Sequence, residues 1–230
     1  MISNVSNGQW VVIFDMDGVL LDSEPVQMQA FNLTMKPYGI VFDEAEFIKL
    51  IGIRSIDNFR AIVNQYKLDA AATELNRKKE EHYHALISKQ AKPRSGIINL
   101  LHDLEAHNVY RAVASSSPRH DVTLCLEKLV ISNRFHVITT GDDVKLGKPD
   151  PEIFELTQKR ISKKAGRDIP TQHCIVIEDN AFGVKAAVSA GMRCIAAPTS
   201  LTADQDFSQA VRVVDDIDEL DIELLFSLIG

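Results

Sequence analysis

Short apolar runs alternate with amphipathic segments over most of this chain of 230 residues. Compact apolar runs are typical of buried strands, whereas apolar residues spaced three or four apart indicate helices. Strands are predicted at Trp10–Phe14, Tyr110–Ala114, Val137–Thr139, Cys174–Ile177, Arg193–Ala196 and Val211–Val214. Helices are predicted at Ile97–His107, Asp121–Leu129, Pro151–Ile161, Ala181–Ala190 and Ile217–Leu228. This alternation predicts an α/β fold with a parallel sheet that carries helices on both faces.

One long interval interrupts the alternation. Between Ser23 and Pro93 no run is typical of a strand, and four segments combine helical spacing with many good helix formers. These segments are Val26–Lys36, Asp43–Leu50, Ile56–Tyr66 and Ala71–Gln90. We therefore predict a core domain of residues 1–22 and 94–230, with a helical domain of residues 23–93 inserted after the first strand.

Composition and charge narrow the class of protein. The chain is 45% hydrophobic and 25% charged with a formal net charge of −7, so we expect no broad basic surface for nucleic acid or an anionic membrane. No apolar stretch reaches the roughly 18 residues of a membrane span, and the polar start lacks the features of a signal peptide. Cys125, Cys174 and Cys194 lie in apolar runs without a CxxC spacing, which indicates buried thiols. We expect a cytoplasmic monomer.

Two carboxylates, Asp15 and Asp17, directly follow the first predicted strand. Ligands bind beyond the carboxyl ends of the strands in a sheet of this kind, so the pair suits a functional site. A polar turn that merely closes the strand is the alternative. A calcium loop of the EF-hand type is excluded, because its twelfth position should be acidic and is Val26 here.

Three serines follow the second of the predicted strands that end in polar residues. Ser117 suits a helix cap before Pro118, which leaves Ser115 and Ser116 without a structural explanation. Hydroxyl groups at the N-terminus of a helix favour a bound phosphate. The segment is therefore a candidate phosphate site.

A lysine and a second acidic pair follow two further strands. Lys148 precedes Pro149, which occupies the place of the hydroxyl in a Walker A loop, so we predict a fixed charge for an anion rather than a P-loop. Glu178 and Asp179 end a strand as Asp15 does. Such carboxylates repel each other in an apolar crevice unless a cation lies between them, and an oxygen-only site of this kind favours Mg²⁺.

Together these segments resemble the four motifs of the haloacid dehalogenase superfamily, close to its β-phosphoglucomutase-like phosphatases. The matching segments are Asp15–Pro25, Ala114–Ser117, Lys148–Pro151 and Glu178–Gly183, with the helical insert after the first. The resemblance covers nearly the whole chain. It implies a Rossmann-like core with a small helical cap, and a Mg²⁺-dependent phosphatase that acts on a small phosphorylated metabolite such as a sugar phosphate.

The resemblance also implies roles for individual residues. Asp15 would be the nucleophile that becomes an aspartyl phosphate, and Asp17 the general acid and base. Ser115, Ser116 and Lys148 would bind the phosphate oxygens. Magnesium would be held by Asp15, the backbone carbonyl of Asp17, Glu178 and Asp179. The dehalogenases of the superfamily lack this acid/base and the metal, so the resemblance favours phosphate chemistry.

Two departures from the mutase pattern favour hydrolysis over phosphoryl migration. The mutases of this branch have a histidine where Gln27 stands, and a Gly-x-x-Arg where Gly52 to Arg54 is one residue shorter. Arg54 would bind a second anionic group of the substrate or lie on the surface, and the same holds for Arg119 and His120. A phosphomutase, a catalytically silent regulatory protein and a metal-binding structural domain remain as alternatives.

Overall fold

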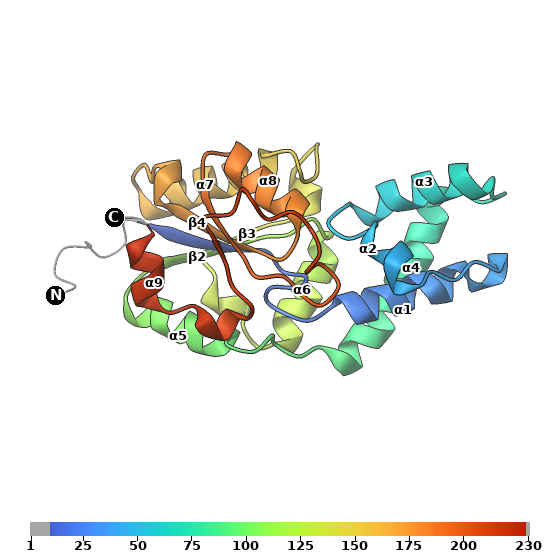
Figure 1. Ribbon diagram of the computed structural model, residues 1–230, viewed down its shortest axis with the longest axis horizontal. Coiled ribbons are helices and arrows are strands. Elements are labelled where there is room, and N and C mark those ends of the chain that lie inside the picture. The colour runs from blue at the N-terminus through green and yellow to red at the C-terminus, as the bar shows by residue number, and fades with distance from the viewer. Residues whose placement is uncertain (1–9, 229–230) are drawn as a thin grey trace.

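The computed structural model describes residues 10–228, which contain one six-stranded sheet (Figure 1). Its strands all run parallel, in the order β3-β2-β1-β4-β5-β6. The strands are β1 (Val11–Phe14), β2 (Tyr110–Ala114), β3 (Val137–Thr139), β4 (Cys174–Glu178), β5 (Arg193–Ala196) and β6 (Arg212–Val213). The predicted parallel α/β fold is confirmed, and the strand order reverses beside β1, where this architecture forms a crevice.

Helices cover both faces of the sheet. They are α5 (Ile97–Ala106), α6 (Arg119–Lys128), α7 (Glu152–Ala165), α8 (Ala181–Ser189) and α9 (Ile222–Ser227). Successive side chains of a strand point to opposite faces. Val12 and Phe14 of β1 accordingly join an apolar cluster with α5, α6 and α9, whereas Val11 and Ile13 join a second cluster with α7 and α8. Figure 1 shows these two layers on either side of the strands.

The insert after β1 is helical, as predicted. It contains α1 (Glu24–Met35), α2 (Glu44–Ile48), α3 (Ser55–Tyr66) and α4 (Ala72–Gln90), which extend beyond one end of the sheet (Figure 1). A third apolar cluster holds the outer parts of these helices together: Phe31, Met35, Phe42, Phe47, Phe59, Ile62 and Leu75. Their inner ends are embedded in the first core cluster, through Val26 and Ala30 of α1 and Tyr83 and Ile87 of α4. The division at residues 23 and 93 stays a prediction.

The C-terminal helix differs from the prediction. Instead of one helix over Ile217–Leu228, the chain forms a short 3₁₀ turn at Ile217–Glu219 and then α9. The break arises because Asp221 accepts a hydrogen bond from the Leu224 amide at 2.7 Å and so starts a new helix. The apolar spacing continues across the break, which explains the prediction of one helix.

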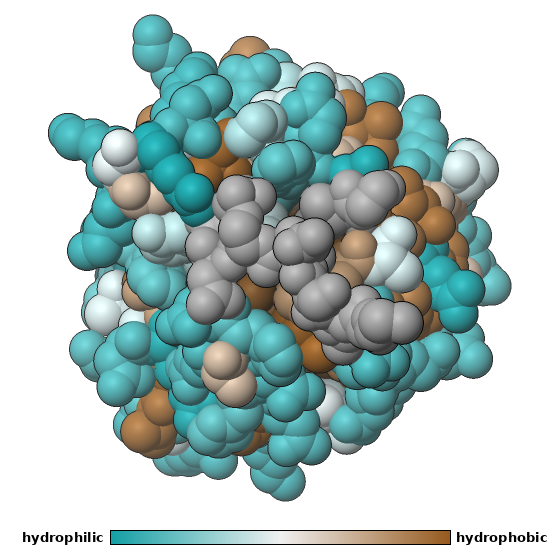
Figure 2. All heavy atoms as spheres, turned by 90° about the vertical axis from the view of Figure 1, so that its left-hand side faces the viewer, coloured by the Kyte–Doolittle hydropathy of each residue, from teal (hydrophilic) through white to brown (hydrophobic). Residues whose placement is uncertain are grey.

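Two features expected from composition can be compared with the structure. Cys125, Cys174 and Cys194 are buried free thiols, as predicted. No helix within residues 10–228 is both long and apolar enough to cross a membrane. Figure 2 shows the face opposite the insert, where hydrophilic side chains predominate and apolar ones are scattered among them. The predicted site lies toward the other end of the molecule, beside the insert.

Candidate active site

The four segments singled out in the sequence meet at one edge of the sheet. Asp15 follows β1, the serines follow β2, and Glu178 ends β4, and these three strands are neighbours. Lys148 comes from the segment that leads into α7 and reaches the same place. A pocket opens there between the core and the insert. The insert contributes Gln27, Phe31, Arg54 and Lys79 to its lining, among others.

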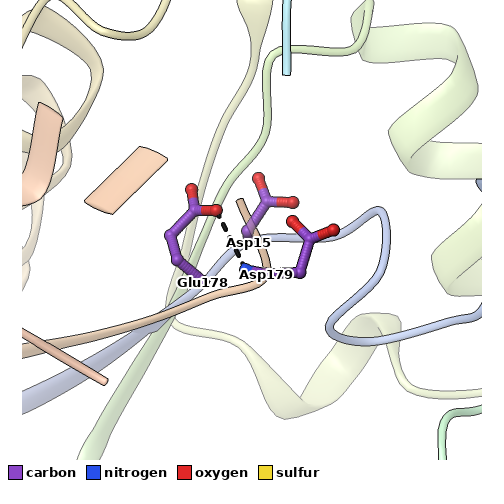
Figure 3. Close-up of side chains that lie close together, drawn as sticks. All are labelled: Asp15, Glu178 and Asp179. Atoms are coloured by element: carbon purple, nitrogen blue, oxygen red, sulfur yellow. Dashed lines mark hydrogen bonds between the residues drawn. The ribbon is translucent and has the colours of Figure 1, made fainter. Parts of the chain in front are cut away.

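Three buried carboxylates lie together at the base of this pocket. The ligand oxygens of Asp15, Glu178 and Asp179 are within 4.8 Å of one another (Figure 3). The Asp179 amide donates to Glu178 Oε2 at 3.2 Å, and Asn180 Nδ2 donates to Asp179 Oδ1 at 2.9 Å. Burial raises the pKa of Asp15 to about 8 although Lys148 opposes the rise. Burial and the neighbouring Glu24 raise the pKa of Asp179 well above its usual range. The cluster is therefore short of positive charge.

Lys148 supplies part of that charge. Its Nζ lies 2.5 Å from Asp15 Oδ1 and 2.5 Å from Glu178 Oε1, and donates to the Ala114 carbonyl at 3.1 Å. Burial alone would lower the pKa of Lys148, but the two carboxylates outweigh it and raise this pKa. A charged ammonium is thus fixed beside Asp15. That it also binds phosphate oxygens stays a prediction.

The remaining oxygens fit a divalent cation. Asp179 Oδ2 is buried and finds no hydrogen-bond partner among the described residues. Glu24, which is only 4% exposed, likewise has both carboxylate oxygens unpartnered within residues 10–228, and burial raises its pKa to about 7. Buried carboxylate oxygens that lack a positive partner are suitable ligands for Mg²⁺. Glu24 was not among the predicted site residues.

Three side chains hold Asp17 in place. The Ser23 hydroxyl and Gln27 Nε2 donate to Oδ1, the latter at 3.4 Å, and the Ser117 hydroxyl donates to Oδ2 at 2.9 Å. The prediction of Ser117 as a helix cap is therefore wrong, since α6 has Pro118 at its N-cap without a side-chain bond. Ser117 instead lines the pocket, where its hydroxyl orients Asp17, the predicted acid/base.

The other two serines have different surroundings. Ser116 lines the pocket with a buried hydroxyl that has no partner in the described part of the chain. Ser115 Oγ accepts a bond from the Ser117 amide at 3.1 Å and is not among the described residues that line the pocket. Ser116 thus lines the pocket, whereas the Ser115 hydroxyl is bonded within its own loop. That Ser115 and Ser116 bind phosphate oxygens stays a prediction.

Arg54 lines the pocket but already has partners. Its Nε donates to Asp57 Oδ2 at 2.8 Å and its Nη1 to the carbonyl of Lys145 at 3.1 Å, which joins the insert to the segment before Lys148. Arg119 and His120 are exposed and lie outside the described lining, and Arg119 pairs with Asp143. These two residues therefore have no visible part in the site.

Lys79 of α4 is a pocket residue that the sequence interpretation missed. It is 4% exposed, and its Nζ lies 4.9 Å from the Tyr83 ring centroid and 5.6 Å from that of Phe31. Within the described residues it forms no salt bridge, and burial lowers its pKa. The spacing along the helix could have revealed its burial, because the buried residues of α4 recur every four positions: Leu75, Lys79, Tyr83 and Ile87.

A parallel sheet with a predicted nucleophile at the end of its central strand, and an acidic cluster beside it, defines a class of α/β hydrolases with a helical insert. The model of the haloacid dehalogenase-like hydrolases matches residues 12–197. The chain belongs to this family. The predicted family resemblance is confirmed.

Three similar proteins illustrate the likeness. The chain is 29% identical to the phosphorylated carbohydrates phosphatase of Thermotoga maritima, over 80% of this chain and 82% of that protein. The structure of CbbY from Rhodobacter sphaeroides in complex with phosphate superposes with a TM-score of 0.83 at 26% identity, covering 91% of this chain and 95% of that one. The β-phosphoglucomutase of Clostridium difficile gives a TM-score of 0.79 at 26% identity, covering 95% and 96%.

Proposed function

We propose that this chain is a Mg²⁺-dependent phosphatase that hydrolyses a small phosphorylated metabolite, such as a sugar phosphate, through an aspartyl phosphate. The observation that carries the proposal is the juxtaposition of Asp15 and Asp17 in one pocket with the buried acidic cluster and Lys148. Relatives support it, since one is named for phosphorylated carbohydrates and another was solved with phosphate.

The chemistry assigns one task to each aspartate. A carboxylate oxygen of Asp15 attacks phosphorus while the bond to the leaving oxygen breaks, and Asp17 gives that oxygen a proton. Asp17 then takes a proton from water, which attacks phosphorus and releases inorganic phosphate as the bond to Asp15 breaks. Lys148, Ser115 and Ser116 would bind the phosphate oxygens. Mg²⁺, held by Asp15, Glu178, Asp179 and the carbonyl of Asp17, would screen the negative charge of the transferring group.

The helical insert would select the leaving group. Its pocket residues include the cations Arg54 and Lys79 and the apolar side chain of Phe31, whereas the groups suited to phosphate come from the core. A closed insert would also exclude bulk water while Asp15 attacks. Residues 23–93 would thus act as a cap, and residues 1–22 and 94–230 as the catalytic core.

Gln27 favours hydrolysis over mutase activity. Its Nε2 donates to Asp17, and its buried Oε1 has no partner in residues 10–228. An amide neither takes up nor releases a proton near neutral pH, unlike the histidine found at this place in the mutases. A phosphomutase remains the second candidate because of the structural similarity to β-phosphoglucomutase.

A panel of phosphate esters tests the proposal. We expect release of inorganic phosphate from one or more sugar phosphates with Mg²⁺, and loss of that activity with excess chelator. Ca²⁺ should inhibit, because it can bind both oxygens of the Asp15 carboxylate and turn the nucleophile away from phosphorus. Isomerised product that precedes free phosphate would favour the mutase, and full activity without divalent metal would contradict the proposed metal.

The acidic cluster should also make stability depend on pH. The pKa values of Asp15 and Glu24 are raised to about 8 and about 7, so their contribution is complete below about pH 4 and is lost as the pH rises through these values. Metal-free protein should therefore lose stability between pH 6 and pH 8. Each kcal/mol corresponds to roughly 2–4 °C in melting temperature for a chain of this size.

Magnesium provides the control for this prediction. Because the metal binds ionised carboxylates, it should raise the melting temperature more at pH 8 than at pH 6. Thermal unfolding with chelator and with Mg²⁺ at each pH separates the cluster from other titrating groups. If Mg²⁺ raised the melting temperature equally at pH 6 and at pH 8, the carboxylates of the cluster would not be the groups that bind the ion.

A further inference from the structure

Arg94, where the insert returns to the core, has its side chain only 11% exposed and binds backbone carbonyls. Its Nη1 donates to the carbonyls of Gly18 and Ala197, both at 2.6 Å, and its Nη2 to that of Pro198 at 2.9 Å. Asp216 lies 3.6 Å from its Nε on the more open side. One guanidinium therefore joins the loop after β1 to the segments that follow β5 and β6.

Gly18 connects this guanidinium to the acidic cluster. Its φ is +77°, and a Cβ added there would lie 2.3 Å from Asp179 Oδ2 and 2.5 Å from Glu24 Oε1. The Gly18 backbone thus touches the carboxylates on one side and Arg94 on the other. Gly18 follows Asp17 directly. The bond from Arg94 to the Gly18 carbonyl therefore also helps to restrain the Asp17 carbonyl, which is the proposed magnesium ligand.

Both connections of the insert pass this point. The Arg94 amide donates to the Leu20 carbonyl at 3.0 Å, and Pro93 forms an antiparallel bridge with Leu21. The chain that leaves the core and the chain that returns to it are thus paired beside the loop that carries Asp17. A movement of the insert would be transmitted to that loop unless the loop is fixed independently.

We propose that Arg94 is a positioning residue, whose guanidinium fixes the loop of Asp17 and Gly18 against Asp179 and so sets the geometry of the magnesium site. It touches neither the nucleophile nor the substrate pocket as described. The kinetic part of this inference rests on the proposed function, whereas the metal-binding part does not. The planar fork matters because its donors are spread over separate nitrogens and so reach carbonyls of different segments at once, whereas all donors of an ammonium lie on one nitrogen at the end of a flexible stem.

Arg94→Lys is the test, and Arg111→Lys is its matched control. Arg111 is also buried, donates to the carbonyls of Val109 and Arg134 at 2.8 and 2.7 Å, and lies 3.7 Å from Glu105. It is near the start of β2, away from the pocket. Both variants should lose some thermal stability. Only Arg94→Lys should weaken Mg²⁺ binding, measured by the metal concentration needed for half of the thermal shift, by about 10- to 100-fold.

The turnover of an aryl phosphate at saturating Mg²⁺ gives the second readout. Arg94→Lys should lower kcat about tenfold with little change in KM, because the acid/base is misplaced while the substrate contacts remain. If the chain hydrolyses no phosphate ester, the proposed function fails, but the metal titration still decides the role of Arg94. Equal metal midpoints for both variants and the wild type would overturn the inference.

A second variant separates a positioning role from a folding role. Arg94→Gln removes the charge and keeps a short amide donor, and it should weaken Mg²⁺ binding at least as much as Arg94→Lys. Circular dichroism establishes whether each variant is folded before the titration. Failure of both Arg94 variants to fold, while Arg111→Lys folds, would show that these bonds are required by the fold itself and would overturn the positioning role.

Discussion

Asp15→Asn is expected to abolish turnover, by roughly 10⁴-fold or more, while the fold remains intact. The amide that replaces the carboxylate cannot attack phosphorus, although it fills nearly the same volume. It also removes one member of a crowded acidic cluster, in which burial raises the pKa of Asp15 to about 8. Metal-free Asp15→Asn should therefore be at least as stable at pH 8 as the wild type. Steady-state assays with Mg²⁺ and thermal unfolding in chelator measure the two effects.

The exposed Asp206 offers a control for this substitution. Asp206→Asn makes the same chemical change away from the pocket and should leave turnover unaltered. Trapping of a phosphorylated chain in the wild type, and its loss in Asp15→Asn, would tie the defect to the covalent step. Retained phosphatase activity in a normally folded Asp15→Asn protein would refute the assignment of the nucleophile.

Lys148→Met should have the largest combined effect on stability and activity. The ammonium is the partner that Asp15 and Glu178 share at 2.5 Å, and its removal leaves both carboxylates buried without it. Breaking a buried ion pair in this way costs about 3–5 kcal/mol. At roughly 2–4 °C per kcal/mol, the melting temperature should fall by about 6–20 °C. Turnover should fall by roughly 10²-fold or more, because a fixed charge beside the transferring phosphate is lost.

Magnesium and a neighbouring lysine make this prediction specific. Mg²⁺ should restore part of the lost stability of Lys148→Met, since it can neutralise the same carboxylates. Lys145→Met changes an exposed lysine of the same segment and should alter neither stability nor turnover appreciably. If Lys148→Met were as stable as Lys145→Met without metal, the charge balance described for the cluster would be incorrect.

The sheet and the ends of its strands could be predicted because they depend on local patterns. An apolar run such as Cys174 to Ile177 is buried on both faces, and its neighbours along the chain are helices. Parallel strands bring their carboxyl ends to one edge, so Asp15 and Asp179 could be placed together from topology alone. The broken C-terminal helix shows the limit of this approach, because the side-chain cap of Asp221 outweighed the apolar spacing.

The rest of the site depends on contacts between distant segments. Ser117 was assigned to a helix cap because a serine before Pro118 suits one, yet its hydroxyl bonds to Asp17, 100 positions earlier. Lys79 stands in a run of charged residues, where a lysine is normally solvated, and only the packing of α4 buries it. The carbonyls bound by Arg94 carry no sequence signal, since every residue has one.

The inner ends of α1 and α4 are fixed in the core, whereas the outer part of the insert has an apolar cluster of its own. Val26 and Tyr83 belong to the core cluster, so an opening that preserves this cluster moves the outer parts of these helices together with α2 and α3. Arg54, at the N-cap of α3, would move with these outer parts once its bond to the Lys145 carbonyl breaks. Lys79 lies between Leu75 of the outer cluster and Tyr83 of the core cluster, so it would move little during such an opening. A substrate that enters the open pocket would thus meet the nearly stationary Lys79 first, and Arg54 only when the insert closes.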